Sequence, residues 1–143
     1  MLFAHGDQGG GYVVSIEDGL VVLAYNAYGV MHRSEPIALP EGETRVALEA
    51  EALPEFRWAL RLRVGAAAGE LGPAPMMIGM APFTGISVGA DRGGPVDWVG
   101  YEREKSFPYT GTLLSVRYEP GKQADYDPAL LARLWAEAER LTP

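Results

Sequence analysis

Two carboxylates, Asp91 and Asp97, flank a glycine-rich loop and could bind a metal ion there. Calcium in proteins takes about six to eight oxygen ligands from carboxylates, backbone carbonyls and water. Two carboxylates are few for that number, and a loop aspartate often accepts backbone N–H groups instead. We therefore expect Asp91 to fix its own loop, and we keep Asp91 and Asp97 only as weak metal candidates.

Histidine is the other possible source of chemistry, and the chain has two, His5 and His32, with Asp7 close to the first. A Ser-His-Asp triad assembles in space, so the sequence alone leaves an enzyme using these three residues open. However, no serine lies in a Gly-x-Ser-x-Gly elbow, and no His-x-x-x-His pair is present. The chain also has no cysteine, which excludes thiol catalysis, thiolate metal sites and disulfides. We predict no catalytic residue and no cofactor.

Glycines and aromatic side chains could still form a binding site. The Gly9-Gly10-Gly11 run completes no Gly-x-Gly-x-x-Gly pattern and opens a strand, so it indicates a bend at a sheet edge. Flat aromatic faces can stack on sugar rings, but those of this chain do not fall on one strand face. The residues we consider for binding are Asp91, Asp97, Trp98, Tyr101 and Tyr109, with Tyr25 and Tyr28 as further dispersed aromatics.

Charge limits the possible partners. The net charge is −7, from 19 acidic and 12 basic residues, whereas binding to nucleic acid or to an anionic membrane needs clustered lysine and arginine. No run approaches the roughly 18 apolar residues of a membrane span. The first residues also lack the pattern of a signal peptide, which favours a cytoplasmic location. We expect neither a nucleic acid nor a membrane partner.

The strand pattern predicts the architecture. At 143 residues the chain has the size of one domain, and glycine and proline divide its first 120 residues into short apolar segments. Asp18-Gly19 predicts a type I′ turn joining strands over residues 12–16 and 20–25, of which the second is apolar on both faces and should lie centrally. We therefore predict an all-β, antiparallel two-sheet sandwich.

A second strand pair follows. Residues 44–51 alternate, and residues 56–64 give the clearest period-two pattern, with aromatic and aliphatic side chains on one face and Arg57, Arg61 and Arg63 on the other. Further strands are predicted over residues 75–81, 85–89 and 111–118. In the last of these, Leu114, Val116 and Tyr118 share a face.

The character of the sequence changes after Pro120-Gly121. Asp127 followed by Pro128 predicts a helix N-cap with proline at the first helical position. An apolar stripe at helical spacing follows: Leu130, Leu131, Leu134, Trp135, Ala138 and Leu141. Because an isolated helix of this length is marginal in water, we expect it to dock on the sheets or on another molecule. We therefore divide the chain into a sandwich domain, residues 1–120, and a helical extension, residues 121–143.

Two stretches carry a family resemblance. Residues 10–26 form a Gly-Gly-aromatic strand that runs through an Asp-Gly turn into a strand ending in Tyr-Asn, with Gly29 shortly after. Residues 86–96 read Ile-Ser-Val-Gly-Ala-Asp-Arg-Gly-Gly-Pro-Val, and Phe-Pro-Tyr-Thr-Gly-Thr follows at 107–112. In this order, over about residues 2–119, the motifs resemble the C-terminal β-sandwich domain of bacterial arylsulfatases. The resemblance implies a concanavalin- or laminin-G-like jelly roll.

The departures from that family bear on function. Sulfatases need a Cys/Ser-x-Pro-x-Arg segment for their nucleophile, but the Ser34 and Ser106 triplets are followed by Ala38 and Thr110 where arginine is required. The family's metal ligands lie in a large α/β domain for which this chain has no room. Residues 65–69 also lack the family's second Asp-Gly hairpin.

These departures lead to a functional expectation. We expect a non-catalytic accessory module that packs on a sulfatase catalytic domain or self-associates. The alternative is a stand-alone module that binds a glycan or a sulfated ligand, an idea carried by analogy between folds.

Overall fold

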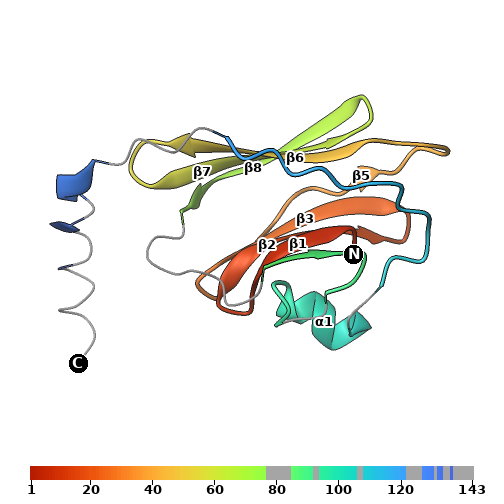
Figure 1. The fold of residues 1–143 in the computed structure, drawn as a ribbon, viewed down its shortest axis with the longest axis horizontal. Helices are drawn as coiled ribbons and strands as arrows, with labels where there is room; N and C mark the ends of the chain where they lie inside the picture. Colours follow the sequence, from red (N-terminus) through yellow and green to blue (C-terminus); the bar gives the residue numbers. More distant parts are fainter. Residues whose placement is uncertain are drawn as a thin grey trace.

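The computed structural model of the chain describes residues 1–76, 85–91, 94–105, 108–121, 127–130, 132–133 and 136. It is mostly β with two antiparallel sheets, as the alternating pattern predicted, and it contains one short helix, α1, besides the beginning of a C-terminal helix. Figure 1 shows the two sheets facing each other, with the helix α1 on the far side of the first sheet.

The first sheet has the strand order β4-β3-β2-β1-β9, and β5 also pairs with β3. Its strands are β1 (Phe3–Asp7), β2 (Gly10–Glu17), β3 (Leu20–Ala27), β4 (Val30–Arg33), β5 (Ile37–Ala38) and β9 (Ile86–Val88). The predicted hairpin is confirmed: Glu17 pairs with Leu20, and the turn residues Asp18 and Gly19 have φ values of 51° and 78°. β3 is buried along almost its whole length, as predicted for a central strand.

The second sheet has the order β6-β7-β8, with strands β6 (Val46–Leu53), β7 (Arg57–Val64) and β8 (Ala67–Pro75). The alternation predicted for β7 is confirmed, because Leu60, Leu62 and Val64 are buried and its arginines are exposed. The strand predicted to begin at Pro75 is wrong in its position, because β8 ends at that residue. Residues 77–81 of that predicted strand lie outside the described part of the chain.

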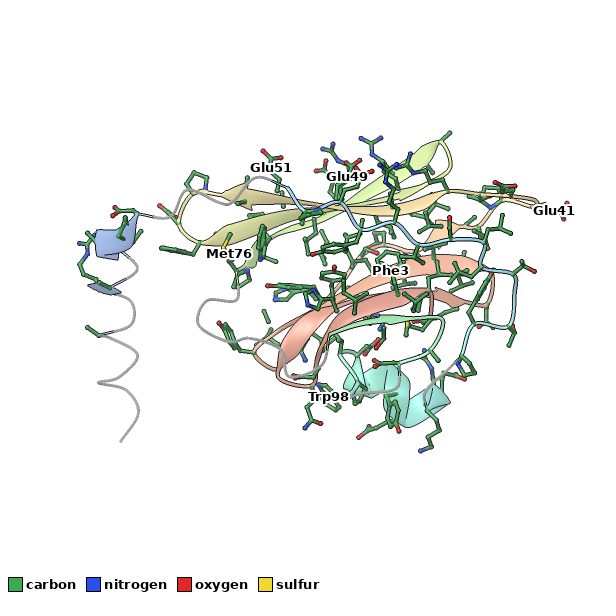
Figure 2. The ribbon with its side chains drawn as sticks, viewed as in Figure 1. Phe3, Glu41, Glu49, Glu51, Met76 and Trp98 are labelled. Carbon is green, nitrogen blue, oxygen red and sulfur yellow. The ribbon has the colours of Figure 1, made fainter. Side chains whose placement is uncertain are left out.

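The main core lies between the two sheets. Its buried members come from both sheets and are Leu2, Val14, Val21, Leu23, Tyr25, Ala27, Leu60, Leu62, Val64 and Ala74. Phe3 packs against this cluster, and Figure 2 shows it between the sheets. Removing this apolar surface from water is what holds the two sheets together.

A second, smaller apolar cluster covers the other face of the first sheet. It consists of Met1, Ala4, Val13, Ala24 and Val96. Val96 belongs to the loop that leads into α1 (Trp98–Glu104), a helix that the sequence analysis did not predict. The first sheet therefore has apolar contacts on both faces, which explains why β3 is apolar on both.

Residues 108–121, which we call the strap, run in an extended course along one open side of the two sheets (Figure 1, blue). The strand predicted over residues 111–118 is wrong, because no residue of the strap joins a sheet ladder. The Tyr109 N–H donates to the Gly89 carbonyl at 2.8 Å, and Leu113 packs against the main core. These two contacts tie the strap to the sheets.

The beginning of the C-terminal helix is as predicted. The Asp127 Oδ1 accepts hydrogen bonds from the N–H groups of Ala129 (2.9 Å) and Leu130 (3.3 Å), which makes Asp127 the N-cap. Residues 128–130, 132–133 and 136 are helical. Most of the predicted apolar stripe lies outside the described residues, so its docking stays a prediction. Within the described part of the chain, no helix has the length and apolar character needed to cross a bilayer.

Candidate functional site

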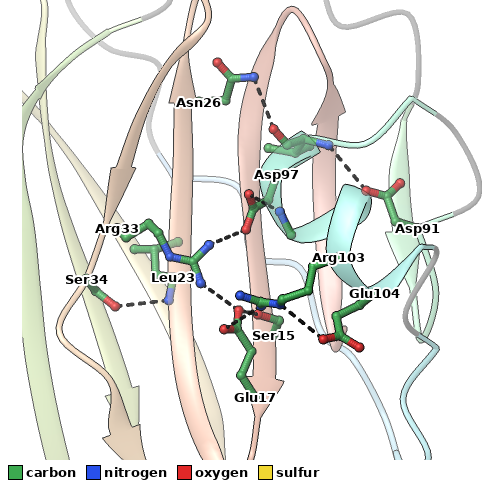
Figure 3. Close-up of polar contacts among 12 residues, drawn as sticks. Ser15, Glu17, Leu23, Asn26, Arg33, Ser34, Asp91, Asp97, Arg103 and Glu104 are labelled. Atoms are coloured by element: carbon green, nitrogen blue, oxygen red, sulfur yellow. Dashed lines mark hydrogen bonds and ion pairs between the residues drawn. The ribbon is translucent and has the colours of Figure 1, made fainter.

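The loop before α1 is held by a buried asparagine and a buried aspartate. Asn26 is fully buried, and its Nδ2 donates to the carbonyls of Gln8 (3.0 Å) and Val96 (3.2 Å). Its Oδ1 accepts the Gly29 N–H at 2.7 Å. Asp91, also buried, accepts the Val96 N–H at 3.4 Å, which agrees with the role expected for it (Figure 3). Val96 is thus fixed from two sides.

Asp97 joins two parts of this region, because its two carboxylate oxygens bind different groups. Oδ1 accepts the Gly100 N–H at 3.0 Å and caps α1, while Oδ2 forms an ion pair with Nη1 of Arg33 on β4 (Figure 3). A Cβ on Gly100 would lie 2.8 Å from Oδ2, so the close approach requires glycine there. With Asp97 only 2% exposed, this ion pair fastens α1 to the first sheet.

The ion-pair network continues from Arg33 to Glu17 at the end of β2. Arg33 Nη2 contacts Glu17 Oε1 at 2.7 Å, and Arg103 Nη2 of α1 contacts Oε2 at 3.1 Å. Ser15 Oγ also donates to Oε1 at 3.1 Å. Burial alone would raise the pKa of Glu17, but its bonds and charge contacts with Arg33, Ser15 and Arg103 outweigh burial and lower it. Burial likewise acts to lower the pKa of Arg33, and Glu17 and Asp97 together raise it.

The carboxylates of this region hold α1 and its loop against the first sheet. Each of the carboxylates Asp91, Asp97 and Glu17 accepts at least one hydrogen bond or ion pair within the protein. Among the described residues, no group of three or more histidine, aspartate or glutamate side chains is gathered as a metal site would require. Asp91 and Asp97 therefore gain no third ligand of that kind from the described chain.

The structure brings together only some of the aromatic candidates. Trp98 and Tyr101 lie three residues apart on α1, next to Asp97, with Trp98 exposed and Tyr101 half-buried. Figure 2 shows Trp98 beyond the first sheet, on the side away from the second. Tyr109 instead lies on the strap, half-buried against the main core. The predicted binding residues thus do not form one platform.

The two histidines lie in a row of rings across the first sheet. His5, Tyr12, Tyr25 and His32 are paired in register from β1 to β4, so they share one face of the sheet. The ring centroids are 5.8 Å apart for His5 and Tyr12 and 6.2 Å apart for Tyr25 and His32. Tyr12 and Tyr25 separate the two histidines, so His5 and His32 are not neighbours in this row.

The polar atoms of this row make mainly structural contacts. The Tyr25 hydroxyl donates to the Pro75 carbonyl at 2.6 Å, which joins the first sheet to the end of β8. Burial, together with Tyr118 of the strap, raises the pKa of Tyr12. His32 Nε2 is buried and has no hydrogen-bond partner among the described residues. Asp7, the third residue of the enzyme alternative, accepts the Gly9 N–H at 2.8 Å in the turn after β1.

Sequence reasoning missed this row because it depends on the register of four strands. Only the Tyr12–Tyr25 pair follows from the Asp18-Gly19 turn, since the turn fixes that register. His5 and His32 join the row through two further hairpins that the sequence analysis did not predict.

One apolar surface is exposed where β9 and the strap lie at the open side of the sheets. It consists of Ile86, Val88, Leu114, Val116 and Tyr118, and we call it the edge surface; these side chains are 40% to 70% exposed. Ile86 pairs with His5, whose ring centroid lies 6.5 Å from that of Tyr118, so the strand and the strap meet there. The shared face predicted for Leu114, Val116 and Tyr118 is turned toward solvent.

Comparison with known proteins does not assign the chain to a family. A scan of protein-family models finds no match, and searches of curated proteins and of solved structures find no significant match.

Proposed function

We propose that the chain is a non-catalytic accessory module, a jelly-roll sandwich resembling the C-terminal domain of an arylsulfatase. Its role is to pack against a sulfatase catalytic domain or against a second copy of itself. The observation that carries this proposal is the edge surface, because exposed apolar side chains gathered in one place mark an interaction site more often than scattered ones do.

The charged and polar groups support the same proposal. The carboxylates at the predicted site are engaged in fixing α1 and its loop to the first sheet. The sequence also lacks the Cys/Ser-x-Pro-x-Arg segment from which a sulfatase makes its nucleophile. A module of this kind would contribute surface rather than chemistry to an assembly.

The test of packing compares variants at exposed apolar side chains. Leu114→Ser and Val116→Ser, each as a single variant, remove side chains that are 70% and 40% exposed from the strap, whereas Val30→Ser removes one that is 60% exposed from β4. Sedimentation velocity over a range of concentrations, with the chain alone and with the catalytic domain of an arylsulfatase added, should show a complex. Each strap variant should weaken the complex and Val30→Ser should keep it. A wild-type chain that stays monomeric both alone and with the catalytic domain would contradict the proposal.

The test of catalysis is an assay of this chain with a chromogenic sulfate ester. We expect no turnover above the buffer blank. Turnover at an enzyme-like rate, lost on substitution of His5 or His32, would replace the accessory role with an enzymatic one.

A further inference from the structure

The outer face of the second sheet differs in charge from the rest of the molecule. While the whole chain carries −7, this face presents four arginines and three glutamates: Arg45, Arg57, Arg61, Arg63, Glu49, Glu51 and Glu70. Figure 2 shows Glu49 and Glu51 projecting from β6 away from the first sheet. A locally positive face on an acidic protein attracts small anions more strongly than its other surfaces do.

Within this face, a shallow hollow of about 310 Å³ lies at one end of β6 and β7. It is lined by Arg45, Ala47, Glu49, Arg63 and Gly65. Ala47 and Gly65 have little or no side chain, so the space between the two arginines stays open. Arg45 and Arg63 therefore both line a volume that can hold a small polyatomic anion.

The two arginines have hydrogen-bonding capacity to spare. Arg63 Nε lies 2.8 Å from Glu49 Oε1, a contact that uses one of the roughly five N–H donors of a guanidinium group. The backbone carbonyl of Arg45 accepts the Gly65 N–H at 2.9 Å, but its guanidinium group makes no hydrogen bond or ion pair with any residue that the structure describes. By contrast, Arg61 is paired with Glu70 and Arg57 donates to the Pro73 carbonyl. Arg45 is thus the arginine of this face whose guanidinium group has no partner among the described residues.

We propose that this hollow is an oxyanion site, in which Arg45 and Arg63 bind the sulfate, phosphate or carboxylate group of a small ligand. The planar fork of a guanidinium group matches the oxygens of such groups and can bind two of them at once. Glu49 keeps the net charge of the lining at about +1 and competes for Arg63. Because the site is also open to water, we expect a dissociation constant on the order of millimolar at low salt. The site does not depend on the packing role proposed above.

The first experiment titrates the full chain with inorganic sulfate while amide shifts are followed by NMR, at constant ionic strength set with sodium chloride. Saturable shifts should appear at Arg45, Ala47 and Gly65. Arg45→Ala should weaken binding at least fivefold. Arg57→Ala removes a charge from the same face without touching the hollow, and should change binding less than twofold. Equal weakening by both variants, or shifts that never saturate, would overturn the site.

A second pair of variants tests the competition from Glu49. Glu49→Gln frees Arg63 and should tighten sulfate binding severalfold, while Glu51→Gln changes the charge of β6 equally but lies outside the hollow and should alter binding less than twofold. Equal tightening by both would show a general charge effect and reject the site. Parallel titrations with phosphate and with acetate then distinguish a tetrahedral oxyanion from a carboxylate as the preferred group. Saturation by none of the three anions would contradict the proposal.

Discussion

The outer faces of the two sheets both carry arginine–carboxylate ion pairs, but the pair on the first sheet is more deeply buried than the pair on the second. On the first sheet, Asp97 is 2% exposed and pairs with Arg33 beneath the loop and α1. On the second sheet, Glu49 and Arg63 are about half exposed, and no further layer of described residues covers them. A buried pair left incomplete costs much more than an exposed one, because the remaining charge has lost its water. The first face should therefore be sensitive to substitution and the second tolerant.

The largest expected effect is at Asn26, a buried residue of the first sheet. It tests whether substitutions on the buried face cost more than substitutions on the exposed face. Asn26→Ala removes hydrogen bonds to Gln8, Val96 and Gly29 from a fully buried site, and we expect a loss of about 3 kcal/mol in the free energy of unfolding. Glu51→Ala, on the exposed face, should change that free energy by less than about 0.5 kcal/mol. Chemical denaturation measures both. A loss below that of a typical surface substitution would break the comparison.

Asp97 should give the next largest effect. Asp97→Ala removes the N-cap of α1 and one partner of Arg33, so we expect a loss of about 2 kcal/mol in unfolding free energy. Asp97→Asn keeps a capping oxygen and removes the charge, and should cost about half as much. If the two variants are equally destabilised, capping contributes nothing and the ion pair alone fastens the helix.

Glu17 tests the same ion-pair network through pH. The quantity to follow is the contribution of its charge to the free energy of unfolding. Its pKa is lowered in the folded state, so its contribution is present above the ordinary value of 4.5 and is lost as the pH falls through the folded pKa. Since Glu17 is partly exposed, we expect Glu17→Gln to cost about 0.5–1 kcal/mol at pH 7. The difference from wild type should shrink as the pH falls toward 3 in denaturation experiments. A difference that is the same at every pH would show that Glu17 does not act through its charge.

The features predicted correctly are those with local causes. The Asp18-Gly19 turn fixes its hairpin, the arginine alternation fixes β7, and Asp127 caps the helix it precedes. In each case the signal lies within a few residues of the element that it determines, so no knowledge of the topology is needed.

The missed features lack such local signals or depend on distant contacts. β8 begins with Ala67, Ala68 and Gly69, which show no alternation of apolar and polar side chains. α1 has seven residues, too few for an apolar period to be recognised, although Asp97 is a residue type that caps helices. The Arg33–Asp97 pair joins residues 64 positions apart, so only the topology reveals that Asp97 acts on β4.

The smallest expected effect concerns the outer face of the second sheet. It measures how strongly the carboxylates of that face hold its arginines. Arg63→Ala and Glu49→Ala should each change the unfolding free energy by less than about 0.5 kcal/mol, because an exposed pair exchanges one set of contacts for water. The coupling energy from the double-mutant cycle should be equally small and should fall further in 0.5 M sodium chloride, an ionic strength of about 0.5 M that screens exposed charges. A coupling above about 1 kcal/mol would mean that Glu49 holds Arg63 as firmly as Asp97 holds Arg33. In that case Arg63 would not be available to an anion. Arg45 would then be the one described residue of the hollow with a guanidinium group free to bind an anion.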